Sequence, residues 1–290
     1  LVKLDARVIL LTHLGRPKGI EEALRLDPIA RHLSKLLGKQ VLKLDDCIGD
    51  EVEERLNGVQ GGEVVLLENV RFYKEEEKND DSFARSLAEL GDVFVNDAFG
   101  VSHRAHASVV GITAYLPSGA GLLLEREIAG LSPVLEPKRP FVVVLGGAKV
   151  SDKIGVLTSL LKRADKVLIG GAMMFTFLAA RGISIGKSML ERDRVPLAKS
   201  LLKAYGRRIV LPVDVMVEDD GKVRTVSIDR IPADAVGLDI GNNTIGLFAK
   251  ELEGAETVFW NGPLGYTEKA RFAKGTEGVA KAVAKCGGKT

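Results

Sequence analysis

The run Phe141–Leu145, with the sequence Phe-Val-Val-Val-Leu, is apolar at every position and ends at Gly146 and Gly147. A strand that is apolar on both faces needs cover on both sides, which is typical of parallel sheets with helices on each face. Short β-rich runs of this kind alternate with helical patterns along the whole chain. The alternation predicts an α/β fold with mostly parallel sheets.

The expected strands and helices follow one another in turn. We expect strands at residues 7–12, 40–44, 63–67, 92–96, 141–145, 166–169, 208–212, 223–227 and 257–260. We expect helices at residues 27–37, 50–56, 81–90, 151–162, 172–180, 196–205, 242–252 and 272–285. The acidic stretch at residues 74–78 is interpreted as a solvated loop or the start of a helix.

A length of 290 residues favours two domains. Residues 1–118 form the first predicted lobe and residues 138–290 the second. Residues 119–137 contain a helical pattern at 121–135 and are expected to form a hinge helix between the lobes. The alternative is that this helix is one more crossover in a single large sheet.

Composition narrows the classes of protein. The net charge of +2 gives no case for a partner that is a nucleic acid or a membrane surface. The sequence has no window of 18 apolar residues, and we expect no signal peptide. Cys47 and Cys286 have no metal-binding spacing and are expected to be free thiols in a reducing, cytoplasmic compartment.

Basic residues follow several strands of the first lobe. Arg16, Arg71 and Arg104 lie just beyond predicted strands, and His13 lies beside the first of them. The carboxyl ends of parallel strands meet at one edge of a sheet, where ligands bind. Because guanidinium forks match phosphate and carboxylate oxygens, this edge predicts a site for a small polyanionic metabolite. His103 and His106 lack the partners for a zinc site.

The second lobe has a different site after the strand at residues 141–145. Gly146 and Gly147 are followed by Lys149 and Lys153, and a helical pattern starts near Ser151. Glycines allow close approach of the backbone, and a helix N-terminus offers unpaired N–H groups. With two lysines added, the pattern favours binding of phosphate. The alternative is a helix cap beside two solvated lysines.

Further strand ends in this lobe carry glycine and polar residues. Gly170 and Gly171 follow one strand, while Asn261 and Glu268 follow another. Such ends leave room for a base and a sugar, and a carboxylate can accept hydrogen bonds from ribose. A tight turn is the alternative for each glycine. The stretch at residues 182–188 is one residue short of a P-loop, and no G-x-G-x-x-G fingerprint follows a strand.

Taken together, these segments resemble phosphoglycerate kinases. The matching motifs are HLGRPKG, LLENVRF, GDVFVNDAFG, SHRAHAS, LGGAKVSDKIG, IGGAM, LPVDV, GLDIG and WNGPLG, which start at His13, Leu66, Gly91, Ser102, Leu145, Ile169, Leu211, Gly237 and Trp260. They occur in the family's order and span nearly the whole chain.

The resemblance implies two Rossmann-like lobes joined by a helix, and reversible phosphoryl transfer between 1,3-bisphosphoglycerate and ADP. It places 3-phosphoglycerate on the first lobe, at His13, Leu14, Gly15, Arg16, Arg71 and Arg104. It places the Mg²⁺-nucleotide on the second lobe, at Gly147, Lys149, Lys153, Gly170, Gly171, Gly237, Leu238, Asn261 and Glu268. Lys153, Lys149 and Arg16 are the expected catalytic residues, and the chain is expected to be a monomer.

The chain also departs from the family pattern. The family's opening strand with Arg-x-Asp-x-Asn and its closing Gly-Gly-Gly-Asp loop, whose Asp binds Mg²⁺, do not occur in it. We therefore expect a chain truncated at both ends, without a metal ligand of its own and with little or no activity. A nucleotide-dependent oxidoreductase and a non-catalytic binding scaffold are the two alternative classes.

The reaction itself makes few demands on side-chain chemistry. Phosphoryl transfer needs positioning and neutralisation of charge rather than a protein nucleophile. We therefore expect an arginine-lined pocket and a lysine-bearing pocket on separate lobes, facing a common cleft. Closure about the hinge helix would bring the two ligands together and exclude water.

Overall fold

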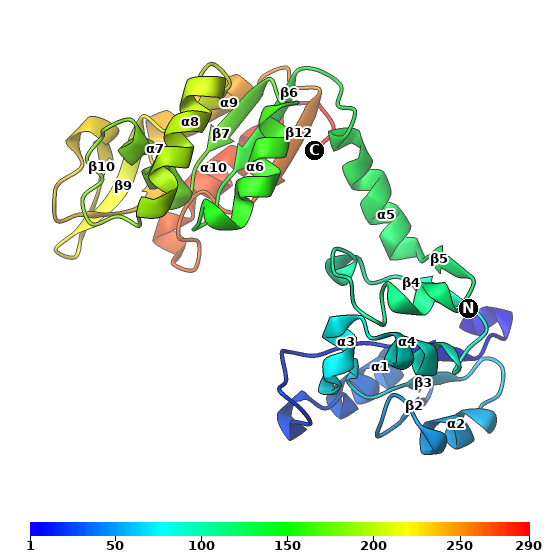
Figure 1. Cartoon of the computed structure of the whole chain (residues 1–290). Helices are drawn as coiled ribbons and strands as arrows, with labels where there is room; N and C mark the ends of the chain where they lie inside the picture. The colour runs from blue at the N-terminus through cyan, green and yellow to red at the C-terminus, as the bar shows by residue number, and fades with distance from the viewer. The chain divides into compact units, whose positions relative to one another are not determined.

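The computed structural model describes residues 1–290, and the chain divides into two compact units (Figure 1). The N-terminal unit comprises Leu1–Gly130 and the C-terminal unit Leu131–Thr290. Both units are α/β and contain parallel sheets, as the sequence predicts. The role of the intervening helix as a hinge stays a prediction.

The N-terminal unit holds two small parallel sheets. Strands β1 (Val8–Leu10), β3 (Val64–Leu66) and β2 (Val41–Lys43) pair in the order β1-β3-β2, and β4 (Phe94–Asn96) pairs with β5 (Ser118–Ala120). The sequence did not predict β5, because Ser-Gly-Ala has no β-branched or aromatic residue. Its hydrogen bonds to β4, which begin with the Phe94 amide on the Pro117 carbonyl at 2.9 Å, define it as a strand.

Four helices lie between these strands in the sequence, and a fifth follows β5. They are α1 (Asp27–Leu37), α2 (Asp50–Asn57), α3 (Lys74–Lys78), α4 (Asp81–Ala88) and α5 (Leu122–Leu131). Helix α4 shows how the sequence specifies them. The Asp80 carboxylate caps its start by accepting the Phe83 N–H at 3.1 Å. Phe83, Ala84 and Leu87 are buried along one face, which packs into the core.

The C-terminal unit is built on a four-stranded parallel sheet in the order β12-β6-β7-β8 (Figure 1). Its strands are β6 (Phe141–Leu145), β7 (Lys166–Ile169), β8 (Ile209–Val210) and β12 (Thr257–Asn261). All five side chains of β6 are buried. The apolar run therefore marks a central strand, as predicted.

An antiparallel sheet completes this unit. Strand β9 (Asp214–Asp219) lies between β10 (Lys222–Ser227) and β11 (Val236–Ile240). The sequence predicted only β10. Acidic residues at both ends of β9, and Gly237 and Asp239 within β11, weaken the strand pattern of those two segments.

The helices of the C-terminal unit are mostly where they were expected. They are α6 (Ile154–Leu161), α7 (Met173–Ala180), α8 (Val195–Tyr205), α9 (Asn242–Leu252) and α10 (Lys274–Val283). A short 3₁₀ turn, η7 (Ser151–Lys153), leads directly into α6. None of the helices in the chain has the length and apolar character needed to cross a membrane.

The packing of α6 yields a direct test of this core. Leu157 is fully buried, whereas its neighbour Val156 is 45% exposed. We expect Leu157→Ala to lower the free energy of unfolding by about 2–5 kcal/mol, because it leaves a cavity. Val156→Ala, the matched control, should change it by about 0.5 kcal/mol or less. Urea unfolding followed by fluorescence of Trp260, the single tryptophan, measures both; equal effects would contradict the assigned packing.

Candidate active site

A basic cluster forms in the N-terminal unit around His13, which lies beyond β1. Burial lowers the pKa of His13, and the nearby positive charges of Arg71, His106 and Arg104 lower it further, while Glu76 opposes them. Residues from three separate loops are therefore close enough for their charges to act on one imidazole. The structure brings Arg71 and Arg104 close to His13, whereas Arg16, the third arginine of the strand-end prediction, is not among the groups that act on this imidazole.

Arg71 ties this cluster to the turn after β1. It lies in η3 (Val70–Phe72), and 7% of its side chain is exposed. Its Nη1 donates to the Gly15 carbonyl at 2.9 Å. Its Nε lies 3.6 Å from a Glu77 carboxylate oxygen, too far for a hydrogen bond, and is buried without a hydrogen-bond partner. Arg71 thus fixes the turn after β1 through its hydrogen bond to Gly15.

Asn69, which is fully buried, stabilises the same turn after β1. Its side-chain amide donates to the carbonyls of Leu14 at 2.9 Å and Leu24 at 3.0 Å, and its oxygen accepts the Arg71 N–H at 3.1 Å. Gly15 has a φ of +68°, which favours glycine. Arg16 follows it and is exposed. The turn therefore presents Leu14, Gly15 and Arg16 from a rigid base.

A buried carboxylate supports this base. Glu68 accepts the Leu26 N–H at 3.0 Å and pairs with Lys43 at 2.6 Å and Arg25 at 3.1 Å. Both Glu68 and Asn69 lie within the LLENVRF motif. Sequence reasoning gave neither of them a role, although the motif marked the place.

The acidic stretch at residues 74–78 is helix α3, and its middle residue is not solvated. Glu76 is 2% exposed and accepts hydrogen bonds from the Ser108 N–H at 2.9 Å and the Ser108 hydroxyl at 2.6 Å. His106 Nδ1 lies 3.5 Å from the same carboxylate. The expectation of a solvated stretch is wrong at Glu76, which anchors the segment that carries Arg104.

In the C-terminal unit, Lys153 lies where three strand-end loops meet. Its Nζ contacts the side-chain oxygen of Asn261, the last residue of β12. Its Cε lies 2.9 Å from where a Cβ on Gly147 would stand, and its Nζ is 3.1 Å from the same position on Gly262. Burial lowers the pKa of Lys153, and Asp152 opposes this. Lys149, earlier in the same loop, is exposed.

The glycines of these loops allow backbone to touch backbone. A Cβ on Gly171, whose φ is +63°, would stand 2.4 Å from the Gly147 nitrogen. A Cβ on Gly146 would stand 2.0 Å from the Pro263 carbonyl oxygen. The Gly147 N–H donates to that oxygen at 2.8 Å. Close packing between loops therefore requires glycine at these positions, whether or not a ligand binds.

The other two glycines proposed for the nucleotide site leave room for protein side chains. A Cβ on Gly170 would stand 2.6 Å from Leu264, and one on Gly237 would stand 2.1 Å from the ring of Phe175. The space left by the missing side chain of Gly237 is thus filled by an aromatic ring. Its contribution to a binding surface would come from its backbone.

The start of the helix after Lys149 differs from the expectation. The N–H groups of Val150 and Ser151 were expected to be free for phosphate, but the Glu191 carboxylate accepts hydrogen bonds from both. The Ser151 hydroxyl also donates to Glu191, at 2.5 Å. A side-chain carboxylate thus takes the position of an anion at this helix N-terminus.

The backbone of Leu238 contacts the segment that leads to Glu268. The Leu238 carbonyl accepts the Tyr266 N–H at 2.8 Å, two residues before the exposed Glu268. Next to Leu238, the fully buried Asp239 carboxylate accepts the Gly275 N–H at 2.8 Å. Burial raises the pKa of Asp239 to about 6. Asp239, which sequence reasoning missed, joins β11 to the start of α10.

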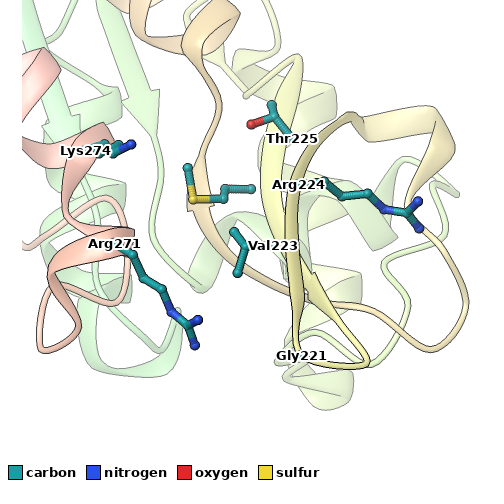
Figure 2. Close-up of a pocket in the computed structure, with 7 residues that line it drawn as sticks. Gly221, Val223, Arg224, Thr225, Arg271 and Lys274 are labelled. Atoms are coloured by element: carbon teal, nitrogen blue, oxygen red, sulfur yellow. The ribbon is translucent and has the colours of Figure 1, made fainter.

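A separate hollow lies between the β9–β10 hairpin and the start of α10 (Figure 2). It has a volume of about 520 Å³ and is lined by Met216, Gly221, Val223, Arg224, Thr225, Arg271 and Lys274. Arg271 pairs with Glu218 at 3.0 Å and Arg224 with Asp219 at 2.8 Å. Two of the three cationic side chains that line the hollow are therefore paired with carboxylates. None of the residues predicted for the nucleotide site lines this hollow.

A protein-bound Mg²⁺ has little support from these side chains. No group of three or more His, Cys, Asp or Glu is gathered as metal ligands would be. The groups around Lys153 are an amide and glycine backbone, and Mg²⁺ prefers carboxylate and phosphate oxygens. The residues present do not form a site for the ion.

The chain has two α/β units. One contains an arginine–histidine cluster, and the other contains lysine-bearing loops at its strand ends. This combination is typical of enzymes that act on phosphorylated metabolites. Comparison with known proteins gives the family. The family model for phosphoglycerate kinase matches residues 1–290. A phosphoglycerate kinase from Dictyoglomus turgidum is 52% identical over 287 residues, which cover 96% of this chain and 72% of that protein. The chain belongs to the phosphoglycerate kinase family.

Solved structures agree. Phosphoglycerate kinase from Coxiella burnetii matches with a TM-score of 0.85 and 40% identity, over 99% of this chain and 75% of that one. The enzyme from Pyrococcus horikoshii matches with a TM-score of 0.89 and 32% identity, over 99% and 76%. The predicted family, the fold of two Rossmann-like lobes and the glycolytic phosphotransferase function are confirmed. The oxidoreductase alternative does not fit this family.

The basic cluster can be tested by titration of the His13 imidazole. His13 should titrate below its usual value of 6.5. Stability should then decrease as the pH falls below about 6.5, because the unfolded chain binds the proton more tightly. Arg104→Gln should raise the pKa of His13, and Arg31→Gln, on the exposed face of α1, should not. NMR titration of the imidazole measures this. No change in Arg104→Gln would show that Arg104 lies elsewhere.

Proposed function

We propose that the N-terminal unit binds 3-phosphoglycerate or 1,3-bisphosphoglycerate, and that the C-terminal unit binds ADP or ATP with Mg²⁺. The membership of the chain in the phosphoglycerate kinase family supports this division. The observation that carries it is Lys153, an ammonium group held at the junction of three strand-end loops. We also propose that the protein acts as a monomer in the cytoplasm.

The N-terminal ligand is negatively charged at its phosphate and at its carboxyl end. The proposed contacts are His13, Leu14, Gly15, Arg16, Arg71 and Arg104. Guanidinium groups bind both kinds of oxygen with paired hydrogen bonds. Arg71 and Arg104 both act on the pKa of His13, which supports their place in one binding site. His13, with its lowered pKa, is neutral at pH 7 and can accept or donate a hydrogen bond.

The C-terminal ligand is a nucleotide, with its phosphates near Gly147, Lys149 and Lys153. The proposed contacts for the base and the ribose are Gly170, Gly171, Gly237, Leu238, Asn261 and Glu268. Lys153 is half-buried, so its charge is screened less by water than that of Lys149. Mg²⁺ would be held by the phosphates of the nucleotide and would neutralise their charge.

No protein nucleophile is needed, because a carboxylate oxygen of 3-phosphoglycerate attacks the terminal phosphorus of ATP and the bond to ADP breaks. The reverse reaction returns the phosphoryl group to ADP. Charge spreads over the oxygens of the transferred group in the transition state. We propose that Lys153 stabilises this charge, with Lys149 and Arg16 as the other catalytic residues. The hinge motion of residues 119–137 and the low activity expected of this chain stay predictions.

Calorimetric titration of the 290-residue chain tests the assignment of the two ligands. We expect ADP and 3-phosphoglycerate each to bind at one site, and neither to block the other. Competition between the two ligands for one site would contradict the proposal. A second experiment measures transfer of the phosphoryl group from ATP to 3-phosphoglycerate in a coupled assay.

Lys153→Ala tests the catalytic role of Lys153. Removal of a preorganised donor to the transition state costs about 2.7–4 kcal/mol, or 100-fold or more in turnover. We expect that loss in the coupled assay when the substitution is made in a full-length phosphoglycerate kinase, because the 290-residue chain is expected to have little or no activity. The affinity for either substrate should change little. Lys250→Ala, in the last turn of α9, is the control. A loss of less than threefold in Lys153→Ala would refute the role.

Arg16→Ala and Arg104→Ala test the basic cluster. Each should weaken the binding of 3-phosphoglycerate by about 10-fold or more, because a charge-assisted hydrogen bond contributes about 1.5–3 kcal/mol. Binding of ADP should stay unchanged in the same titrations. A variant that loses ADP affinity alone would place its arginine in the other site.

A further inference from the structure

Glu191 connects a distant segment to the loop that carries the two lysines. It lies between α7 and α8, 41 positions from Val150 in the sequence. Its carboxylate accepts the N–H groups of Val150 and Ser151 and the Ser151 hydroxyl. These three donors lie between Lys149 and Lys153. A single carboxylate thus accepts hydrogen bonds from three donors of the turn between the two lysines.

Glu191 is itself held in place. Its N–H donates to the Thr176 hydroxyl at 3.3 Å, and Thr176 is 1% exposed within α7. Burial would raise the pKa of Glu191, but the hydrogen bonds from Ser151 and Val150 outweigh burial and lower it. The carboxylate is therefore ionised at neutral pH, and its hydrogen bonds are charge-assisted.

The turn has few other restraints on its position. The Val150 side chain is fully buried, and the Lys153 N–H donates to the Val150 carbonyl at 3.0 Å. Ser151 and Lys153 belong to a 3₁₀ turn of three residues, which is too short to be stable by itself. The contact with Glu191 therefore fixes where the turn lies before any ligand binds.

The contact also decides how an anion can approach. The N–H groups of Val150 and Ser151 are occupied, so a bound phosphate cannot use them as it would use a free helix N-terminus. It must be bound through the lysine side chains and the backbone of the glycine loops. An added phosphate near Glu191 would also meet a like charge.

We propose that Glu191 is a positioning residue, which fixes the turn from Lys149 to Lys153 and directs the phosphates of the nucleotide to the lysine ammonium groups. This inference rests on the proposed nucleotide site of the C-terminal unit. Glu191 acts through Val150 and Ser151 and does not touch the ligand.

Hydrogen exchange tests the positioning without any ligand. In Glu191→Gln, one neutral oxygen replaces a bidentate carboxylate, so the amides of Val150 and Ser151 should exchange at least 10-fold faster. The amide of Phe177, in the buried helix α7, should be unchanged. The matched control is Asp193→Asn, in the same segment, because Asp193 is exposed and pairs with Arg194 at 3.1 Å. Unchanged exchange at Val150 and Ser151, or equal acceleration throughout the C-terminal unit, would overturn the proposal.

Calorimetric titration with ADP tests the consequence for the site. We expect Glu191→Gln to weaken ADP binding about 10-fold, Ser151→Ala to weaken it less, and Glu191→Asp to restore part of the affinity. Binding of 3-phosphoglycerate should not change. ADP affinity within twofold of the unmutated chain in both Glu191→Gln and Ser151→Ala would overturn the inference. Failure of the unmutated chain to bind ADP would instead refute the proposed nucleotide site, and the exchange result at Val150 would still stand.

Discussion

Direct contact between the backbones of the loops after β6, β7 and β12 is the constraint on which the C-terminal site depends. Gly146, Gly147 and Gly171 pack against Pro263 and against each other at distances that no Cβ could share. The contact requires three parallel strands whose carboxyl ends lie at the same edge, which the buried sheet provides. Lys153 extends over this junction, and its ammonium group meets Asn261 there. The closely packed backbone of these loops gives the flexible side chain of Lys153 a defined position.

The N-terminal unit reaches a comparable result by other means. Its turn after β1 is fixed from within by side chains, namely the buried Asn69 amide and the Arg71 guanidinium. Burial lowers the pKa of His13, and the three positive or potentially positive groups around it lower that pKa further. Like charges held together by a protein are poised to gain when an anion binds. The polyanionic ligand proposed for this site would offset the repulsion between these groups.

Much of the fold could be predicted because burial leaves a signature in the sequence. Strand β6 is apolar on both faces, and α4 is amphipathic with a capping Asp80, so local patterns were sufficient. Strands β5, β9 and β11 were missed because Ser118, Asp214 and Gly237 do not favour a strand locally and are placed by partner strands. In such segments, tertiary context determines the structure.

Part of the candidate site could also be predicted from local sequence, and part of it could not. Lysines and arginines after strands could be identified because their chemistry and their place at the sheet edge are both local properties. Asn69 and Glu191 could not, since each acts through contacts 55 and 41 positions away in the sequence. Local pattern also predicted a free helix N-terminus at Ser151, and only the structure reveals that a carboxylate occupies it.

The central claim is that the three strand-end loops of the C-terminal unit form the nucleotide site. Hydrogen exchange of the 290-residue chain with saturating ADP tests it most directly. The account predicts slower exchange in residues 146–153, 170–173 and 261–265, and no change around Gly15 and Arg71. Slower exchange at the hollow formed by Met216, Arg271 and Lys274, with the three loops unchanged, would contradict it.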